Sequence, residues 1–261
     1  MKINEITSLI EAFAPLGWQA SYDNAGLVVG RPDDEVHAAL LAVDVTEEVI
    51  AEAVAKGCDL IITHHPIIFH PLKRLNSASQ VERCVEEAIR RGIALYACHT
   101  NLDSAPEGMS YRLAEMVGVE HCTVLEPSDK GGGVGFGVVG DLPAPVPTME
   151  YLQKVREVLG CQCIRHSRIA SEKVSRVAIC TGAGASMIPL AQRAGADLYI
   201  TADLKYNDFM APEGGLTVAD VGHFESEYCA IEILFDILSK KICTFALLKS
   251  DATRNPINYL F

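Results

Sequence analysis

Residues 37–66 read HAALLAVDVTEEVIAEAVAKGCDLIITHHP, and this stretch decides the fold class. Residues 37–45 are nearly all apolar, as in a strand that is covered on both faces. Thr46 suits a helix N-cap, two glutamates suit the first turn, and Gly57 suits a C-cap. A second apolar run, CDLIITHHP, follows that glycine. The stretch therefore predicts a strand, a helix and a second strand.

The same alternation surrounds this stretch on both sides. Residues 80–93 (QVERCVEEAIRRGI) predict a helix that ends at Gly92, and residues 93–103 (IALYACHTNLD) predict a third strand with polar residues at its carboxyl end. Apolar residues at helical spacing over residues 3–14 predict a further helix. Strands that alternate with helices indicate an α/β fold with a parallel sheet.

The second half of the chain repeats the theme with strand candidates at 174–180 and 196–201 and a helix candidate at 229–240. Six residues recur at an offset of 138: Ala53, Gly57, Asp59, Leu60, Ile62 and Thr63 match Ala191, Gly195, Asp197, Leu198, Ile200 and Thr201. At an offset of 124, His99 matches His223 and Asp103 matches Glu227. Convergent helix–strand patterning is the alternative explanation. Because both blocks recur in the same order, we infer two related βαβ-rich halves, 1–126 and 127–261, that fold together as one unit.

Composition narrows the class of protein. A chain of 261 residues suits one large α/β domain or two small ones. The formal net charge of −12 argues against direct nucleic-acid binding, which needs a basic surface. No apolar run is long enough for a membrane span, and the N-terminus lacks the apolar core of a signal peptide. We expect a cytoplasmic protein that does not bind membranes.

The chain has nine cysteines, an odd number, and no C-x-x-C pair. Disulfides are one interpretation, but buried thiols are favoured in a chain of this size. Six of them lie inside apolar stretches: Cys58, Cys84, Cys98, Cys180, Cys229 and Cys243.

Four segments place histidine or carboxylate at the carboxyl end of a predicted strand, where open α/β sheets bind ligands. They carry Asp44, His64 and His65, His99 and Asp103, and His223, Glu225 and Glu227. Imidazole and carboxylate together are ligands for zinc, iron, manganese or nickel. Adjacent histidines share a site only if their strand ends before them, and Pro66 favours that ending. Since the candidates exceed what one tetrahedral ion uses, we expect two divalent ions, with Glu227 as a possible bridge.

Other motifs favour structural interpretations. The glycines of 135–140 match G-x-G-x-x-G, but no helix pattern follows, so we reject a dinucleotide site. The TGAGAS turn at 181–186 could offer backbone N–H groups to an anion, although a tight strand–helix turn is the favoured explanation. Lys73 and Arg74 suit either a substrate phosphate or a solvated loop. The remaining histidines lack a partner pattern: His37, His70, His121 and His166.

With these motifs in hand, the chain resembles the Nif-three-like family, also described as type 2 homologues of GTP cyclohydrolase I. The resemblance rests on YDNAGLVVG, LLAVDVT, GCDLIITHHPIIF, LYACHTNLDSAPEGMSYRLAE, GVGFGVVGDL, VAICTGAGAS, ADLYITADLKYND, VGHFESE and DATRNPINY, which cover almost the whole chain in family order. One departure is Tyr22, where the family often has tryptophan before its DN-x-GL motif.

The resemblance implies an α/β protein of two related halves with a di-metal centre between them, assembled into a toroidal homohexamer. It assigns the metal ligands to His64, His65, Asp103, His223 and Glu227. His99 lies in the same block and is expected to be a secondary ligand or a proton-transfer residue.

Two functions remain open from the sequence. The first is a metal-dependent hydrolase that acts on a small-molecule substrate. GTP ring opening is suggested by the family name, and phosphate-ester or amide hydrolysis would use the same ligands. The second is a metal-binding or protein-interaction scaffold without turnover, acting through protein contacts because the chain is acidic.

Overall fold

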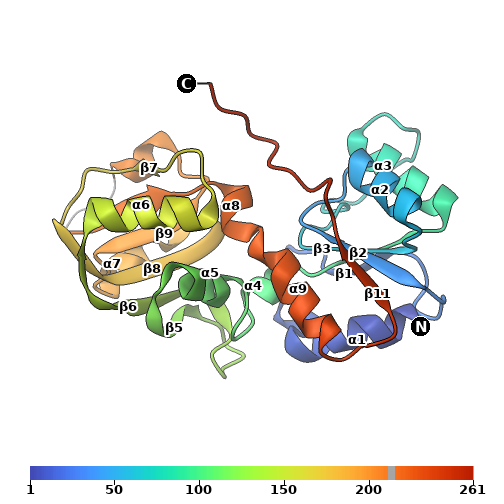
Figure 1. Cartoon of the computed structure of the whole chain (residues 1–261), viewed down its shortest axis with the longest axis horizontal. Coiled ribbons are helices and arrows are strands. Elements are labelled where there is room, and N and C mark those ends of the chain that lie inside the picture. Colours follow the sequence, from blue (N-terminus) through green and yellow to red (C-terminus); the bar gives the residue numbers. More distant parts are fainter. Residues whose placement is uncertain (211–214, 261) are drawn as a thin grey trace. The chain divides into compact units, whose positions relative to one another are not determined.

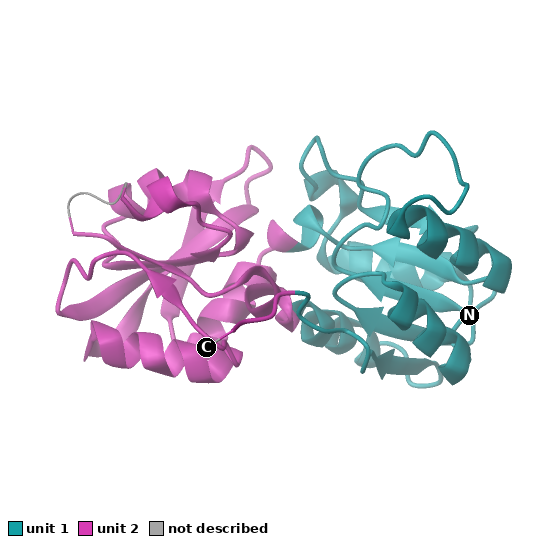
Figure 2. Ribbon diagram, turned by 90° about the horizontal axis from the view of Figure 1, so that it is seen from above, with its two compact units in different colours: residues 1–102, 230–256 teal, residues 103–229, 257–261 magenta. Residues whose placement is uncertain are grey.

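The computed structural model describes residues 1–210 and 215–260. They form two compact units, coloured separately in Figure 2. Unit 1 contains Met1–Leu102 and Ala230–Pro256, and unit 2 contains Asp103–Cys229 and the end of the chain from Ile257. The chain therefore passes from unit 1 to unit 2 after Leu102 and returns after Cys229.

Unit 1 is built on a five-stranded sheet in the order β1-β4-β3-β2-β11. Strands β2, β3, β4 and β11 are parallel, and β1 is an antiparallel edge strand. The strands are β1 (Gly26–Val29), β2 (Ala38–Ala42), β3 (Leu60–Thr63), β4 (Ala94–Ala97) and β11 (Ala246–Lys249). The helices are α1 (Ile3–Phe13), η1 (Leu16–Trp18), α2 (Glu47–Lys56), α3 (Gln80–Arg91), α4 (Thr100–Asp103, whose last residue belongs to unit 2) and α9 (Cys229–Ser239, whose first residue belongs to unit 2).

Helices cover both faces of this sheet, as Figure 1 shows for α2 and α3 on one side and α1 and α9 on the other. Leu40 of β2 and Ile61 of β3 pack with α2 and α3 in one core cluster. Successive residues of a strand point to opposite faces, so Leu41 and Ile62 face the other layer. All four side chains are fully buried. This burial on both faces explains why the strands read as continuous apolar runs.

Unit 2 has a six-stranded mixed sheet in the order β5-β6-β8-β9-β10-β7. Its strands are β5 (Glu120–Pro127), β6 (Gly135–Pro147), β7 (Arg165–His166), β8 (Lys173–Ala183), β9 (Leu198–Ala202) and β10 (Thr217–Asp220). Its helices are α5 (Met109–Val117), α6 (Thr148–Leu159), η2 (Ala185–Met187), α7 (Ile188–Arg193), η3 (Tyr206–Phe209) and α8 (His223–Glu227). Helices α5 and α6 share a core cluster on one face, and α7 packs in the cluster of the other.

The predicted α/β class and the predicted order of strands and helices between residues 37 and 103 are confirmed. Thr46 accepts a hydrogen bond from the backbone N–H of Val49 at 3.2 Å, and Gly57 ends α2 in the left-handed conformation. The glycines of the rejected G-x-G-x-x-G motif lie in β6 and allow β5 to approach closely. A Cβ on Gly140 would lie 2.4 Å from the carbonyl oxygen of Glu120.

The compact units divide the chain differently from the expected halves 1–126 and 127–261. The C-terminal segment returns to unit 1, where β11 pairs in parallel with β2. Buried apolar side chains of α9, including Ile231 and Leu234, return with it. Main-chain pairing and burial of this segment thus complete the core of unit 1.

Each unit contains three parallel strands in sequential order, β2-β3-β4 and β8-β9-β10. Leu60–Thr63 and Leu198–Thr201, which match at an offset of 138, are the middle strands of the two sets. Thr63 pairs with Ala97 in unit 1, and Thr201 pairs with Asp220 in unit 2. Ala97 and Asp220 are therefore equivalent at an offset of 123, whereas His99 and His223 are related by an offset of 124. Unit 2 therefore has one more residue before its histidine, and it adds β5, β6 and β7.

The structure bears on the state of the cysteines and on membrane-spanning helices. All nine cysteines are thiols, and six are buried. Cys243 was expected among the buried ones and is exposed instead, because it lies in the loop between α9 and β11. Among the described residues, no helix combines the length and apolar character that a membrane crossing requires.

Candidate metal centre

Unit 1 presents three histidines after neighbouring parallel strands. Strand β3 ends at Thr63, directly before His64 and His65, as a shared site requires. His99 follows β4 and precedes α4. Because β3 and β4 are parallel neighbours, all three residues belong to the same carboxyl edge of the sheet.

These residues, His64, His65 and His99, form the histidine cluster. One ring nitrogen from each lies within 4.8 Å of the others. The ring centroids are 4.9 Å apart for His64 and His65, and 5.2 and 5.4 Å from these rings to His99. His64 is fully buried, and the other two are half-buried. Three imidazoles so close together suit a cation, because each can direct a lone pair at one point.

An oxygen atom holds Nδ1 of every histidine in the cluster. The Nδ1 atom lies 2.9 Å from the carbonyl oxygen of Cys98 in His64, 2.7 Å from Asp44 Oδ1 in His65, and 2.7 Å from Asp23 Oδ1 in His99. An acceptor at Nδ1 favours the proton there, so Nε2 becomes the nitrogen that can coordinate a metal. The sequence made Asp44 a candidate ligand. Its carboxylate instead lies at Nδ1 of His65, the nitrogen that carries the proton, and so orients that ring.

Asp23 is the most strongly fixed of these acceptors. Its side chain is fully buried and accepts hydrogen bonds from His99, from the Thr100 backbone N–H at 3.0 Å and from the Thr100 hydroxyl. Burial alone would raise the pKa of Asp23, but the hydrogen bonds from His99 and Thr100 outweigh it and lower this pKa to about 2. Asp23 is therefore a permanent carboxylate at neutral pH.

Unit 2 presents a second donor group, formed by Asp103, His223 and Glu227. His223 and Glu227 lie at the two ends of α8, and His223 Nε2 is 2.9 Å from Glu227 Oε2. His223 Nδ1 lies 2.8 Å from Asp203 Oδ2, so this ring is also held by a carboxylate. Burial lowers the pKa of His223, but Glu227 and Asp203 outweigh it and raise this pKa to about 9. The same two carboxylates would favour a bound cation.

Asp103 stands close to this pair. An oxygen of Asp103 lies within 4.8 Å of an oxygen of Glu227, and Glu227 is buried. Burial, together with the negative charges of Asp103 and Glu227, raises the pKa of both Cys180 and Cys229 to about 12. These two thiols stay protonated at neutral pH, and the groups of possible metal ligands found among the described residues contain histidine, aspartate and glutamate only.

Gly182 supports Glu227 in a way that the sequence analysis missed. Gly182 has φ +63°, and a Cβ there would lie 2.2 Å from Glu227 Oε1. Its N–H donates to the hydroxyl of Ser226 at 2.9 Å, so the TGAGAS turn does not offer this group to an anion. The signal was present as a glycine at the end of an apolar strand, but only the fold shows that Glu227 needs the space.

The other predicted candidates lie outside these two groups. Lys73 and Arg74 are exposed, and Glu225 follows His223 on α8. His37, His70, His121 and His166 are exposed. His37 Nδ1 lies 2.8 Å from Asp59 Oδ2, which is the same histidine–carboxylate contact as in the metal centre. Among the described residues, however, His37 belongs to no group of three possible metal ligands.

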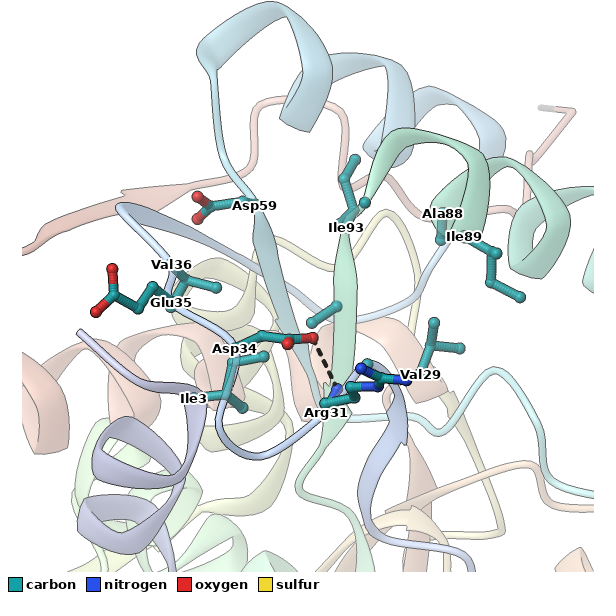
Figure 3. Close-up of a pocket in the computed structure, with 13 residues that line it drawn as sticks. Ile3, Val29, Arg31, Asp34, Glu35, Val36, Asp59, Ala88, Ile89 and Ile93 are labelled. Atoms are coloured by element: carbon teal, nitrogen blue, oxygen red, sulfur yellow. Dashed lines mark hydrogen bonds between the residues drawn. The ribbon is translucent and has the colours of Figure 1, made fainter.

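A cavity of about 650 Å³ opens at the opposite, amino-terminal end of β3 and β4. Figure 3 shows Asp34, Glu35 and Asp59 around it, with Ile3, Val29 and Ile93 among its apolar lining. Asp34 accepts a hydrogen bond from the backbone N–H of Arg31 at 3.2 Å, and Asp59 is bonded to the backbone of His37. Without a histidine or cysteine in its lining, this cavity does not share the chemistry of the two donor groups.

The donor chemistry fits divalent transition metals. Imidazole nitrogens and carboxylate oxygens are ligands of zinc, iron, manganese and nickel, and each histidine has the oriented ring that metal sites favour. The structure thus supports metal binding by buried histidine and carboxylate side chains.

Comparison with known proteins agrees with these motifs. The chain is 35% identical over 230 residues to the GTP cyclohydrolase 1 type 2 homolog of Clostridium perfringens, with 87% of each chain covered. It is 32% identical over 271 residues to the protein of that name from Streptococcus pneumoniae, with both chains fully covered. A crystal structure of the hypothetical protein SA1388 of Staphylococcus aureus matches with a TM-score of 0.90 and 26% identity, covering 100% of this chain and 99% of the other. The profile of the Duf34/NIF3 (NGG1p interacting factor 3) family matches residues 1–256, and the chain belongs to this family.

Proposed function

We propose that the protein is a metal-dependent hydrolase whose two divalent ions are held by His64, His65, Asp103, His223 and Glu227. The observation that carries this proposal is the orientation of the imidazoles. His64, His65 and His223 each have Nδ1 at an oxygen acceptor, which prepares Nε2 for coordination.

The covalent path of the chain supports one centre to which both units contribute. Asp103 is the first residue of unit 2, four positions after His99. Glu227 lies two positions before Cys229, after which the chain returns to unit 1. Donors therefore stand beside both crossings, and we propose that the units share the metal centre. We also propose that the shared three-strand arrangement reflects an internal duplication.

Paired divalent ions, when bound, lower the pKa of a water molecule and polarise the group that is attacked. The chain's own residues prepare this chemistry. Asp44, Asp203 and the carbonyl of Cys98 hold their histidine rings in place. We assign His99, whose Nδ1 is held by Asp23, the role of a secondary ligand or of a proton-transfer residue that acts through Nε2.

The names of the relatives make GTP the first substrate to assay. Phosphate esters and amides come next, because the same donor set serves their hydrolysis. Turnover should be measured with manganese, zinc and iron added separately. Stoichiometric metal without turnover of any of these substrates would favour the scaffold function.

Metal content per protomer, measured by plasma mass spectrometry, tests the centre directly. Untagged protein purified without added metal or chelator should contain about two first-row ions per chain. The Asp103→Ala and Glu227→Ala variants should lose them, whereas Asp141→Ala, which changes a carboxylate paired with Arg176, should retain them. A metal content near zero that added ions do not raise would contradict the proposal.

We further propose that the protein is a cytoplasmic homohexamer. Light scattering should give a mass near six times the 28.2 kDa of one chain. A monomeric mass would contradict this assembly.

A further inference from the structure

Two exposed aromatic rings stand beside the histidine cluster. The Phe69 ring centroid lies 6.1 Å from that of His99 and 6.4 Å from that of Tyr22. Phe69 is 38% exposed and Tyr22 is 68% exposed. His70, also exposed, lies 5.1 Å from Phe69. We call Tyr22, Phe69 and His70 the aromatic platform.

Hydrogen bonds fix the two loops that carry the platform. Asn24 Nδ2 donates to the carbonyl oxygen of Ile68 at 2.6 Å, which ties the loop after Tyr22 to the residue before Phe69. Asp23, the neighbour of Tyr22, binds His99 and Thr100 through its buried carboxylate. The backbone segments that carry Tyr22 and Phe69 are therefore anchored to each other and to residues around the histidine cluster.

The rings of the platform meet one another at an angle, and both keep exposed surface. Tyr22 and Phe69 are tilted by 58°, and Phe69 meets His99 edge-on at 79°. Neither of these two pairs is a face-to-face stack. Aromatic faces next to a reactive centre bind other planar rings by stacking, a contact that is largely independent of the ring's hydrogen-bonding groups.

The size of the platform favours a small molecule over a protein partner. An aromatic side chain buries about 150–250 Å² at most, and the two main rings are already partly covered. A stable protein interface buries about 800 Å² on each partner. Two rings supply much less than this, but they match the face of one planar group.

We propose that the aromatic platform binds an aromatic or heteroaromatic ring of the substrate and so places the hydrolysable group at the histidine cluster. This inference rests on the proposed function and specifies its substrate class. Exposed apolar surface alone is not sufficient for this role: Leu75 is also exposed on unit 1, but it has no aromatic ring and would not favour aromatic substrates.

Binding of two non-hydrolysable probes to zinc-loaded protein tests the platform. Phenylphosphonate and methylphosphonate share the metal-binding group and differ in the ring. By calorimetry, the wild type should bind phenylphosphonate roughly tenfold more tightly than methylphosphonate. The Tyr22→Ala/Phe69→Ala variant should bind both probes with similar affinity while retaining its zinc. The variant Phe69→Leu, which keeps apolar volume, should lose much of the preference.

Tyr206→Ala is the matched control, because Tyr206 is a 79% exposed tyrosine of unit 2. It should keep the wild-type preference for the ring. Equal affinities of the zinc-loaded wild type for both probes would overturn the platform and leave the metal proposal standing. Failure of the wild type to take up zinc would contradict the proposed function itself, and the platform with it.

Discussion

At His65, one carboxylate decides which ring nitrogen can face a metal. Asp44 Oδ1 lies 2.7 Å from Nδ1 of this ring, and Asp203 and Asp23 act in the same way on His223 and His99. A carboxylate at Nδ1 both orients the ring and makes its Nε2 a stronger donor. The three aspartates are therefore expected to affect metal affinity without binding a metal themselves.

The Asp44→Asn variant should bind zinc roughly 10- to 100-fold more weakly, because the amide keeps the shape of the side chain but removes its charge. Competition with a chromophoric chelator measures this affinity. Asp59→Asn is the matched control, since Asp59 holds exposed His37 at 2.8 Å. Equal zinc affinities for Asp44→Asn and the wild type would contradict the role of Asp44.

The Gly182→Ala variant should fold but bind metal weakly, because its Cβ would displace the Glu227 carboxylate. Gly57→Ala is the control for backbone strain: Gly57 has φ +69° against +63° for Gly182, but no atom lies within 4 Å of its Cβ position. Each variant should lose about 1 kcal/mol of stability from the left-handed backbone. Only Gly182→Ala should lose metal in a mass-spectrometric titration, and retained metal would contradict the steric argument.

At the scale of elements, Glu52 joins α2 to the segment that follows β11. Its carboxylate accepts hydrogen bonds from the Ser250 hydroxyl at 2.5 Å, from the backbone N–H groups of Asp251 and Ala252, and from Lys56. Burial raises the pKa of Glu52, but these hydrogen bonds outweigh it and lower this pKa to about 2 from 4.5. This contact fixes the chain end on unit 1.

The stabilisation from Glu52 should be complete above pH 4.5 and should disappear as the pH falls toward 2, because the unfolded state takes up the proton first. At pH 7, Glu52→Gln should reduce the free energy of unfolding by about 2 kcal/mol. Urea denaturation between pH 7 and pH 3 measures both effects. Glu87→Gln on α3, which removes an exposed pair with Arg91, should cost under about 0.5 kcal/mol. Similar losses for both variants would contradict the anchoring role of Glu52.

Elements differed in how far the sequence could predict them. Helices α2 and α3 carry their own caps and C-terminal glycines, so their bounds follow from local chemistry. The pairing of β11 with β2 was not predicted, because it joins Ala246–Lys249 to Ala38–Leu41 across most of the chain. The full length of strand β6 was not predicted for another reason: its glycines break the apolar pattern. Their tertiary contacts explain them, because a Cβ on Gly140 would clash with β5 and one on Gly137 would lie 3.0 Å from the carbonyl oxygen of Ile179 in β8.

At the scale of the whole molecule, the proposed ligands belong to both compact units. A metal that binds the folded chain stabilises it by about 4 kcal/mol at a thousandfold excess over the dissociation constant. Zinc at that excess should therefore raise the midpoint of thermal unfolding, measured by calorimetry. Glu227→Ala should remove this shift, whereas Asp141→Ala should keep it. An equal shift in Glu227→Ala would contradict the assignment of Glu227 as a ligand.

The sequence by itself determined the α/β class, the strand–helix order of residues 37–103 and the residue types for a metal, because burial patterns, caps and donor chemistry are local properties. Only the tertiary structure showed that His64, His65 and His99 converge, that Asp23, Asp44 and Asp203 hold the rings of their histidines, and that Gly182 makes room for Glu227. It also returned the C-terminal segment to unit 1. These contacts join residues far apart in the chain, and strand register and side-chain packing decide them, so they cannot be read from local patterns.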